Sequence, residues 1–113
     1  MNEEYTIKHF DVNFTECRYI GELYRELKKK LELPDWCGEN LDALWDALTG
    51  IMYTPADISV TKKTAWQDIQ EHADSIVAVM QEAEAKYREI TVRILYSKPY
   101  NYTPTIQPRI VSR

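Results

Sequence analysis

Apolar residues spaced three and four positions apart predict a helix over Ile20–Leu31. Ile20, Leu23, Leu27 and Leu31 form its apolar face. The lysines at positions 28–30 lie near its C-terminal end, where cations interact favourably with the helix dipole. We expect Pro34 to stop this helix and residues 35–39 to form a turn-rich connector.

The same spacing predicts two further helical segments. The first is short, over about 41–49, with Asn40 as a good N-cap and Gly50 as a plausible C-terminal cap. Its apolar face consists of Leu41, Leu44, Trp45 and Leu48. The second covers Thr64–Tyr87, as one long helix or as two consecutive helices divided near His72. We expect its periodic residues to pack in the core: Trp66, Ile69, Ala73, Ile76, Met80, Ala83 and Tyr87.

Alternating apolar residues predict three strands, at Tyr5–Phe10, Ala56–Thr61 and Ile90–Tyr96, with a loop from the first strand to about Tyr19. The order is β-α-α-β-α-β, and helical crossovers between strands imply parallel pairing. The sequence therefore predicts an α/β fold with a small three-stranded parallel sheet packed by helices. Residues 1–96 form one domain, and the Pro- and Tyr-containing extension 97–113 is expected to be extended or disordered.

Charge is distributed unevenly along the chain. The net charge is −4, yet residues 31–61 contain no Lys or Arg and carry −6, which leaves +2 elsewhere. The acids of this segment are Glu32, Asp35, Glu39, Asp42, Asp46 and Asp57. Such asymmetry is typical of an electrostatic interaction face, although acidic clusters also simply solvate a surface. Nucleic acid and anionic membranes are not expected partners of an acidic chain.

The acids near the short helix are predicted to form a narrow stripe. At about 100° per residue, Glu39, Asp42 and Asp46 lie on one side and the leucines on the other, with Trp45 between them. The helix dipole accounts for acids in the first turn. It does not account for Asp46, which has no Lys or Arg four residues away. The pattern leaves an interaction role and a purely solvating role for Asp46 equally open.

Other candidate chemistry is sparse. Cys17 and Cys37 carry no metal signature, and we expect two reduced thiols because no export signal precedes them. His9 and His72 are isolated and are expected to be surface residues. The acidic N-terminus and the absence of a long apolar run indicate a cytoplasmic protein with no membrane segment, and no cofactor is expected.

The run from Leu33 to Gly50, LPDWCGENLDALWDALTG, closely resembles the central segment of the barstar family of ribonuclease inhibitors. The preceding leucine-lysine helix, Glu82-Ala83 and Ile90-Thr91 match as well, so the resemblance covers roughly residues 5–96. It implies a three-stranded parallel sheet packed by helices, and an inhibitory surface on the short helix and the loop before it.

The resemblance implies that this surface covers the active site of a basic ribonuclease of the barnase type, with Asp46 in the place of an RNA phosphate. The partner-binding residues that it implies are Trp36, Gly38, Asn40, Asp42, Trp45, Asp46, Thr49, Gly50 and Glu82. The chain departs from the family at Trp36, where the family has a tyrosine, and at Ile51, where it has a tryptophan. We therefore also consider an immunity protein or antitoxin for a different toxin domain. The free inhibitor is expected to be a monomer.

Two readings of another class compete with inhibition. A small hydrolase would use two of Asp42, Asp46 and Glu82 as general acid and base, which requires a pocket. Alternatively, the extension, which carries +3, would bind nucleic acid, but three charges give only weak, salt-sensitive binding. The sequence favours an inhibitor over an enzyme.

Overall fold

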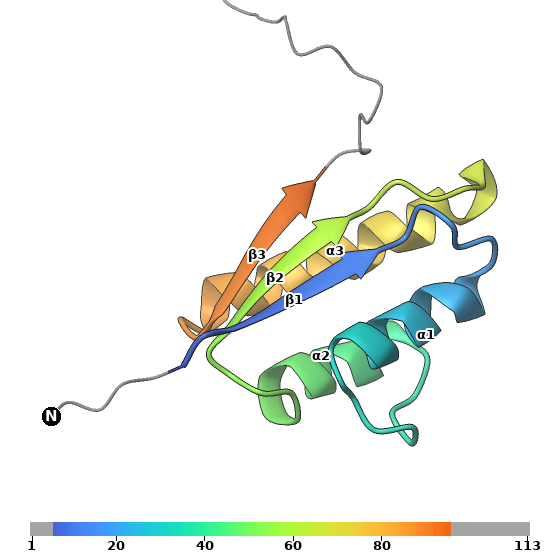
Figure 1. The fold of residues 1–113 in the computed structure, drawn as a ribbon. Helices are drawn as coiled ribbons and strands as arrows, with labels where there is room; N and C mark the ends of the chain where they lie inside the picture. The colour runs from blue at the N-terminus through green and yellow to red at the C-terminus, as the bar shows by residue number, and fades with distance from the viewer. Residues whose placement is uncertain (1–5, 96–113) are drawn as a thin grey trace, which may run out of the picture.

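The computed structural model describes residues 6–95 as one α/β unit (Figure 1). The extension 97–113 that the sequence predicts to be extended or disordered lies outside the described residues. The elements are β1 (Lys8–Asn13), α1 (Ile20–Lys30), α2 (Leu41–Gly50), β2 (Ala56–Thr61), α3 (Gln67–Lys86) and β3 (Ile90–Leu95). Their order confirms the predicted β-α-α-β-α-β pattern.

The three strands form one parallel sheet in the order β1-β2-β3. Ile58 in the central strand is level with Phe10 and Val92, and Val60 is level with Val12 and Ile94. In a strand, alternate side chains point to opposite faces, so these even-numbered apolar residues share one face. The predicted parallel sheet is confirmed.

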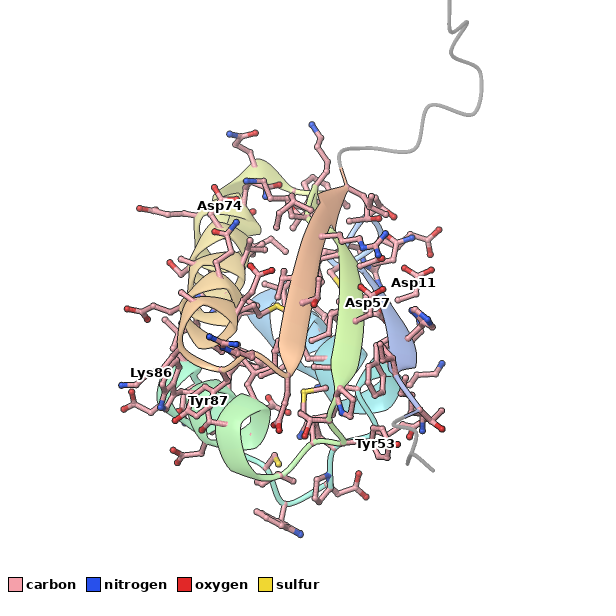
Figure 2. All side chains as sticks on the ribbon, turned by 90° about the vertical axis from the view of Figure 1, so that its left-hand side faces the viewer. Asp11, Tyr53, Asp57, Asp74, Lys86 and Tyr87 are labelled. Carbon is pink, nitrogen blue, oxygen red and sulfur yellow. The ribbon has the colours of Figure 1, made fainter. Side chains whose placement is uncertain are left out.

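All three helices lie behind this apolar face, whereas the other face of the sheet is open (Figure 2). Helix α1 packs against β1, α3 packs against β3, and α2 packs mainly on α3. Parallel sheets are usually covered on both faces. Here the odd-numbered residues of the open face, such as Asp11, Asn13 and Thr91, are polar and exposed. The helices therefore define one core between themselves and the sheet.

The first strand lies further along the chain than predicted. β1 extends from Lys8 to Asn13, so the predicted range Tyr5–Phe10 and the loop that was expected to follow it are wrong in position. Phe10 and Val12 are buried, and the Lys8 amide donates to the Pro55 carbonyl just before β2 begins. Asp11 and Asn13 lie on the open face of the sheet, where polar side chains are exposed to solvent. Their sequence therefore resembles that of a loop.

Helix α3 is a single helix of 20 residues. His72 does not divide it; instead its Nε2 lies 2.7 Å from the hydroxyl of Tyr24, which joins α3 to α1. Burial raises the pKa of Tyr24 to about 12. The prediction that Trp66 packs in the core is wrong, because Trp66 caps the helix start and is 54% exposed.

Helix ends also differ from the sequence predictions. Helix α1 ends at Lys30, before Pro34, because Glu32 adopts a left-handed conformation (φ 59°) and the Leu33 amide donates to the Lys28 carbonyl. Gly50 is the last residue of α2 rather than its cap, which is Ile51. No glycine of the described chain has a positive φ.

Candidate functional site

A tight turn before α2 presents the most exposed large apolar side chain of the described residues. The amide of Cys37 donates to the carbonyl of Pro34 at 3.1 Å, which places Asp35 and Trp36 at the tip of a four-residue turn. Trp36 is 74% exposed, whereas Cys37 next to it is buried and anchors the turn to the core. An exposed tryptophan on an anchored turn is typical of a residue that contacts a partner.

The end of this loop is fixed by the cap of α2. The Asn40 side chain accepts a hydrogen bond from the Ala43 amide at 2.8 Å, which confirms Asn40 as the N-cap. A Cβ atom at Gly38 would lie 3.2 Å from Asn40 Nδ2 and 3.3 Å from the Ala43 Cβ. Glycine at position 38 therefore lets the loop pass close to the helix start. The turn and α2 are held as one continuous surface, which we call the loop–α2 surface: residues 35–40 and the exposed side of α2.

Two carboxylates on the exposed side of α2 have no partner within residues 6–95. Asp42 and Asp46 are exposed, and within residues 6–95 neither side chain forms a hydrogen bond or an ion pair. Four residues apart on a helix, they are neighbours and repel each other by a few tenths of a kcal/mol. The dipole favours Asp42 in the first turn, but its effect has faded at Asp46. This arrangement is slightly unfavourable in the free protein.

Of the remaining acids of the Lys- and Arg-free segment, Asp35 is also exposed, and its carboxylate forms no hydrogen bond or ion pair within residues 6–95, whereas the other three are paired. Glu32 pairs with Lys8 at 2.6 Å, and Glu39 pairs with Lys28 at 3.2 Å. On the open face of the sheet, Asp57 Oδ2 accepts a hydrogen bond from Arg93 at 3.0 Å and lies 3.0 Å from His9 Nδ1. The predicted stripe therefore loses Glu39, which lies before the N-cap and is already paired. Asp42 and Asp46 remain as its core.

Trp45 connects the acids to the core. Its half-buried ring packs against the core cluster and against Tyr87, with ring centres 6.3 Å apart and planes at 56°. Thr49 donates its hydroxyl to the Trp45 carbonyl at 2.8 Å, and Gly50 is exposed at the end of α2. The aromatic ring is therefore held rigidly beside the two carboxylates.

The structure brings eight of the nine predicted residues onto the loop–α2 surface, because they are contiguous in the loop and helix. The ninth, Glu82, is exposed on α3. Glu84, two residues further, accepts from the Val92 amide of β3 at 3.0 Å. Residues two apart point to nearly opposite sides of a helix, so Glu82 points away from β3. Its membership in a binding surface stays a prediction.

Sequence reasoning missed two residues that shape this surface. Tyr87 was assigned to the core, yet it is 38% exposed and forms the outer wall beside Trp45 (Figure 2). Lys28 was assigned to the helix dipole, yet its ammonium group contacts the loop. Neither contact leaves a signal in the sequence, because each joins segments that meet only in the folded chain.

Three surface hollows of the described region are lined by residues other than Asp42, Asp46 and Glu82. Exposed carboxylates outside such hollows favour contact with a partner's surface over acid–base chemistry in a cleft. Both cysteines are free and buried, and burial, with nearby glutamates, raises the pKa of Cys17 to about 11. A protonated thiol of this kind is a poor nucleophile.

Residues 6–95 contain neither a cluster of metal ligands nor a helix that could cross a membrane. No group of three His, Cys, Asp or Glu side chains there could hold a metal ion. Within the same range, none of the helices combines the length and the apolar character needed to cross a membrane.

A family model and a curated protein are similar to this chain. Residues 7–97 match the family model described as Barstar (barnase inhibitor). A curated protein of Bacillus subtilis (strain 168) with the name "Putative ribonuclease inhibitor YrdF" is 39% identical over 72 residues, which covers 62% of this chain and 78% of that protein. The family match spans the six helices and strands and includes the whole loop–α2 surface.

Proposed function

The chain belongs to the barstar family, and from this premise we propose that it inhibits a basic ribonuclease of the barnase type by covering its active site with the loop–α2 surface. The observation that carries the proposal is the pair Asp42 and Asp46, exposed and without a partner in residues 6–95. The name of the Bacillus subtilis relative supports the same activity.

Asp46 is the centre of the proposed mechanism. A ribonuclease holds the RNA phosphate with cationic side chains, and a carboxylate that enters the same place accepts charge-assisted hydrogen bonds from them. Asp46 suits this role because nothing in the described structure neutralises it beforehand. The inhibitor thereby imitates the charge of the substrate and leaves no bond for the enzyme to cleave.

Trp36 and Trp45 keep water away from these ion pairs. Binding energy at protein interfaces concentrates on buried aromatic residues and on charged pairs that neighbouring contacts shield from solvent. In the proposed complex, Trp36 contributes its contacts from the turn and Trp45 from α2. Gly38 and Asn40 add backbone and side-chain contacts of the loop, while Thr49, Gly50 and Glu82 lie at the periphery.

The net charge of the loop–α2 surface also accelerates association. Opposite potentials on two partners steer their encounter, and this effect weakens as salt screens the charges. The Lys- and Arg-free segment 31–61 supplies the negative potential. A basic enzyme is therefore captured faster at low ionic strength.

Partner choice depends on the residues around the acids. Trp36 and Ile51 differ from the family pattern, and Tyr87 adds an aromatic wall next to Trp45. Specificity among related partners is set by such peripheral contacts. The target is thus a ribonuclease or toxin domain with a basic active site, and in the cytoplasm its inhibition would protect the producing cell.

The test is inhibition of a barnase-type ribonuclease at two salt concentrations by the wild type, Asp46→Asn and Asp11→Asn. Asp11 is exposed on the open sheet face, so both variants lose one negative charge from the surface (Figure 2). We expect stoichiometric inhibition by the wild type, a loss of at least about 2 kcal/mol, or roughly 30-fold in affinity, for Asp46→Asn, and almost none for Asp11→Asn.

Equal effects of the two substitutions would reduce Asp46 to a contributor of bulk charge and contradict the phosphate-like role. No inhibition by the wild type would remove barnase-type enzymes as targets. The same assay with other basic ribonuclease toxins would then decide between a different target and no inhibitory activity.

A further inference from the structure

Three consecutive lysines at the end of α1 have three different environments. Lys30 pairs with Glu26 at 2.9 Å and contacts the Asp11 carbonyl at 3.4 Å, on the β1 side. Lys29 is exposed and forms no hydrogen bond or ion pair within residues 6–95. Lys28 points to the loop before α2, and its side chain is only 19% exposed. Helix-dipole stabilisation is common to all three and does not explain this difference.

Lys28 Nζ contacts the loop at three acceptors. It lies 3.2 Å from a carboxylate oxygen of Glu39, 3.4 Å from the carbonyl of Cys37 and 3.5 Å from the carbonyl of Asp35. An ammonium group has three donors, and all three have an acceptor here. These acceptors lie on both sides of Trp36 and extend to the residue before the N-cap of α2.

The loop needs such a connection because little else holds its tip. Leu33 and Cys37 are buried and anchor its two ends, but Asp35 and Trp36 between them are exposed. An open groove of about 510 Å³ lies between this loop and α1. Within the described residues, Lys28 is the side chain that bridges the groove with hydrogen bonds from α1.

We propose that Lys28 is a positioning residue that fixes the turn carrying Trp36 relative to the acids of α2. The proposal rests on the proposed function, since Trp36 matters only if the loop–α2 surface binds a partner. A preformed loop loses less conformational freedom on binding, so the complex is tighter and dissociates more slowly. Lys28 itself need not touch the ribonuclease.

The expected sign separates positioning from simple electrostatics. Removing a lysine makes the inhibitor more negative, and bulk charge alone would speed association with a basic enzyme and tighten the complex. Loss of positioning has the opposite result, because the loop must be ordered during binding. Lys29→Met removes the same charge from the neighbouring position without removing a contact, so it measures the bulk-charge effect.

The experiment compares Lys28→Met and Lys29→Met by surface plasmon resonance against the ribonuclease that the wild type inhibits. Methionine keeps most of the aliphatic stem and removes the donors. We expect about tenfold faster dissociation for Lys28→Met, as for the loss of a charged hydrogen bond, and unchanged or slower dissociation for Lys29→Met. Lys28→Arg, which restores donors to the same carbonyls, should recover part of the affinity.

Amide hydrogen exchange of the free protein gives a readout that needs no ribonuclease. Lys28→Met should increase exchange at the Cys37 amide, which closes the turn, and Lys29→Met should not. This result separates the two proposals: a wild type that inhibits nothing defeats the proposed function, while the exchange data still test the role of Lys28. If Lys28→Met does not fold, Glu39→Gln removes the charge from one of the three acceptors and should have a smaller effect of the same sign. Unchanged exchange at Cys37, or equal dissociation rates for Lys28→Met and Lys29→Met, would overturn the positioning role.

Discussion

The central strand of the sheet and helix α2 both carry acidic side chains, but Asp57 of the strand is paired whereas Asp42 and Asp46 of the helix are not. On the sheet, Asp57 is buried, and its Oδ2 lies 3.0 Å from His9 Nδ1 on one neighbouring strand and accepts a hydrogen bond from Arg93 on the other. On α2, Asp42 and Asp46 are exposed and have no such partner within residues 6–95. Asp42, Asp46 and Asp57 all belong to the segment 31–61, which contains no Lys or Arg.

The difference distinguishes acids that serve the fold from acids that are available to a partner. The Oδ2 atom of Asp57 is paired with groups from both neighbouring strands in the free protein, while its buried Oδ1 has no hydrogen-bond partner among the described residues. Neighbouring unpaired carboxylates repel each other, and a cationic partner relieves that repulsion. The distribution of charge along the sequence does not distinguish the paired acid from the unpaired ones, because the side chains that pair with Asp57 belong to strands far from it in the sequence.

The largest expected effect on affinity is that of replacing Trp36, compared with replacing the other exposed tryptophan, Trp66. Trp36 lies on the loop–α2 surface, whereas Trp66 lies at the start of α3 and is 54% exposed. We expect Trp36→Ala to lower affinity for the ribonuclease by about 2 kcal/mol or more, because buried interface aromatics are typical hot spots. Trp66→Ala should change it by less than about 0.5 kcal/mol. Titration calorimetry measures both, and a larger loss for Trp66 would move the interface away from α2.

A smaller effect should appear in stability when the pairing on the sheet is removed. Asp57→Asn keeps the shape of the side chain but removes the charge that binds His9 and Arg93. We expect a loss of about 1–2 kcal/mol in the free energy of unfolding, less than for a fully buried pair because the side chains of His9 and Arg93 are more than half exposed.

Urea unfolding at neutral pH measures this loss, and Asp46→Asn is the matched control that should leave stability nearly unchanged. Affinity for the ribonuclease should show the reverse pattern. If both substitutions destabilised the protein equally, Asp46 would have a structural role and the distinction between the two faces would fail.

Most of the fold could be predicted because regular patterns dictate it. The bounds of β2 were predicted correctly, and those of α1 and α2 to within a residue. β1 was misplaced because Asp11 and Asn13 face solvent on the open side and resemble loop residues. Trp66 was misassigned because the apolar period of α3 extends one residue before the helix begins, and periodicity does not locate a boundary.

The site was only partly accessible from the sequence pattern. Spacing on α2 identified Asp42 and Asp46, and the roles of Trp36, Gly38 and Asn40 came from the family resemblance. Neither the spacing nor the family resemblance identified Tyr87 and Lys28 as residues of this surface. The contacts of Tyr87 with Trp45 and of Lys28 with Glu39 depend on how α3 and α1 are placed against α2, which no local pattern contains.

The smallest expected effect concerns Gly50, where stability and binding should change in opposite directions. Gly50 is helical and exposed, and an added Cβ atom would meet no atom within 4 Å. Alanine loses less conformational freedom in a helix than glycine, so Gly50→Ala should stabilise the protein by about 0.5–1 kcal/mol. The extra methyl group nevertheless occupies space on the loop–α2 surface, and we expect a few-fold weaker binding if the partner approaches closely there.

Gly21→Ala in α1 is the control, since its Cβ would make only ordinary contacts, the nearest at 3.4 Å to the Tyr19 ring. It should raise the unfolding temperature in the same way without changing affinity. Unchanged affinity for Gly50→Ala would remove Gly50 from the interface and shorten the loop–α2 surface to residues 35–49. Weaker binding despite higher stability would show that the end of α2 retains glycine for the partner's approach and not for its own folding.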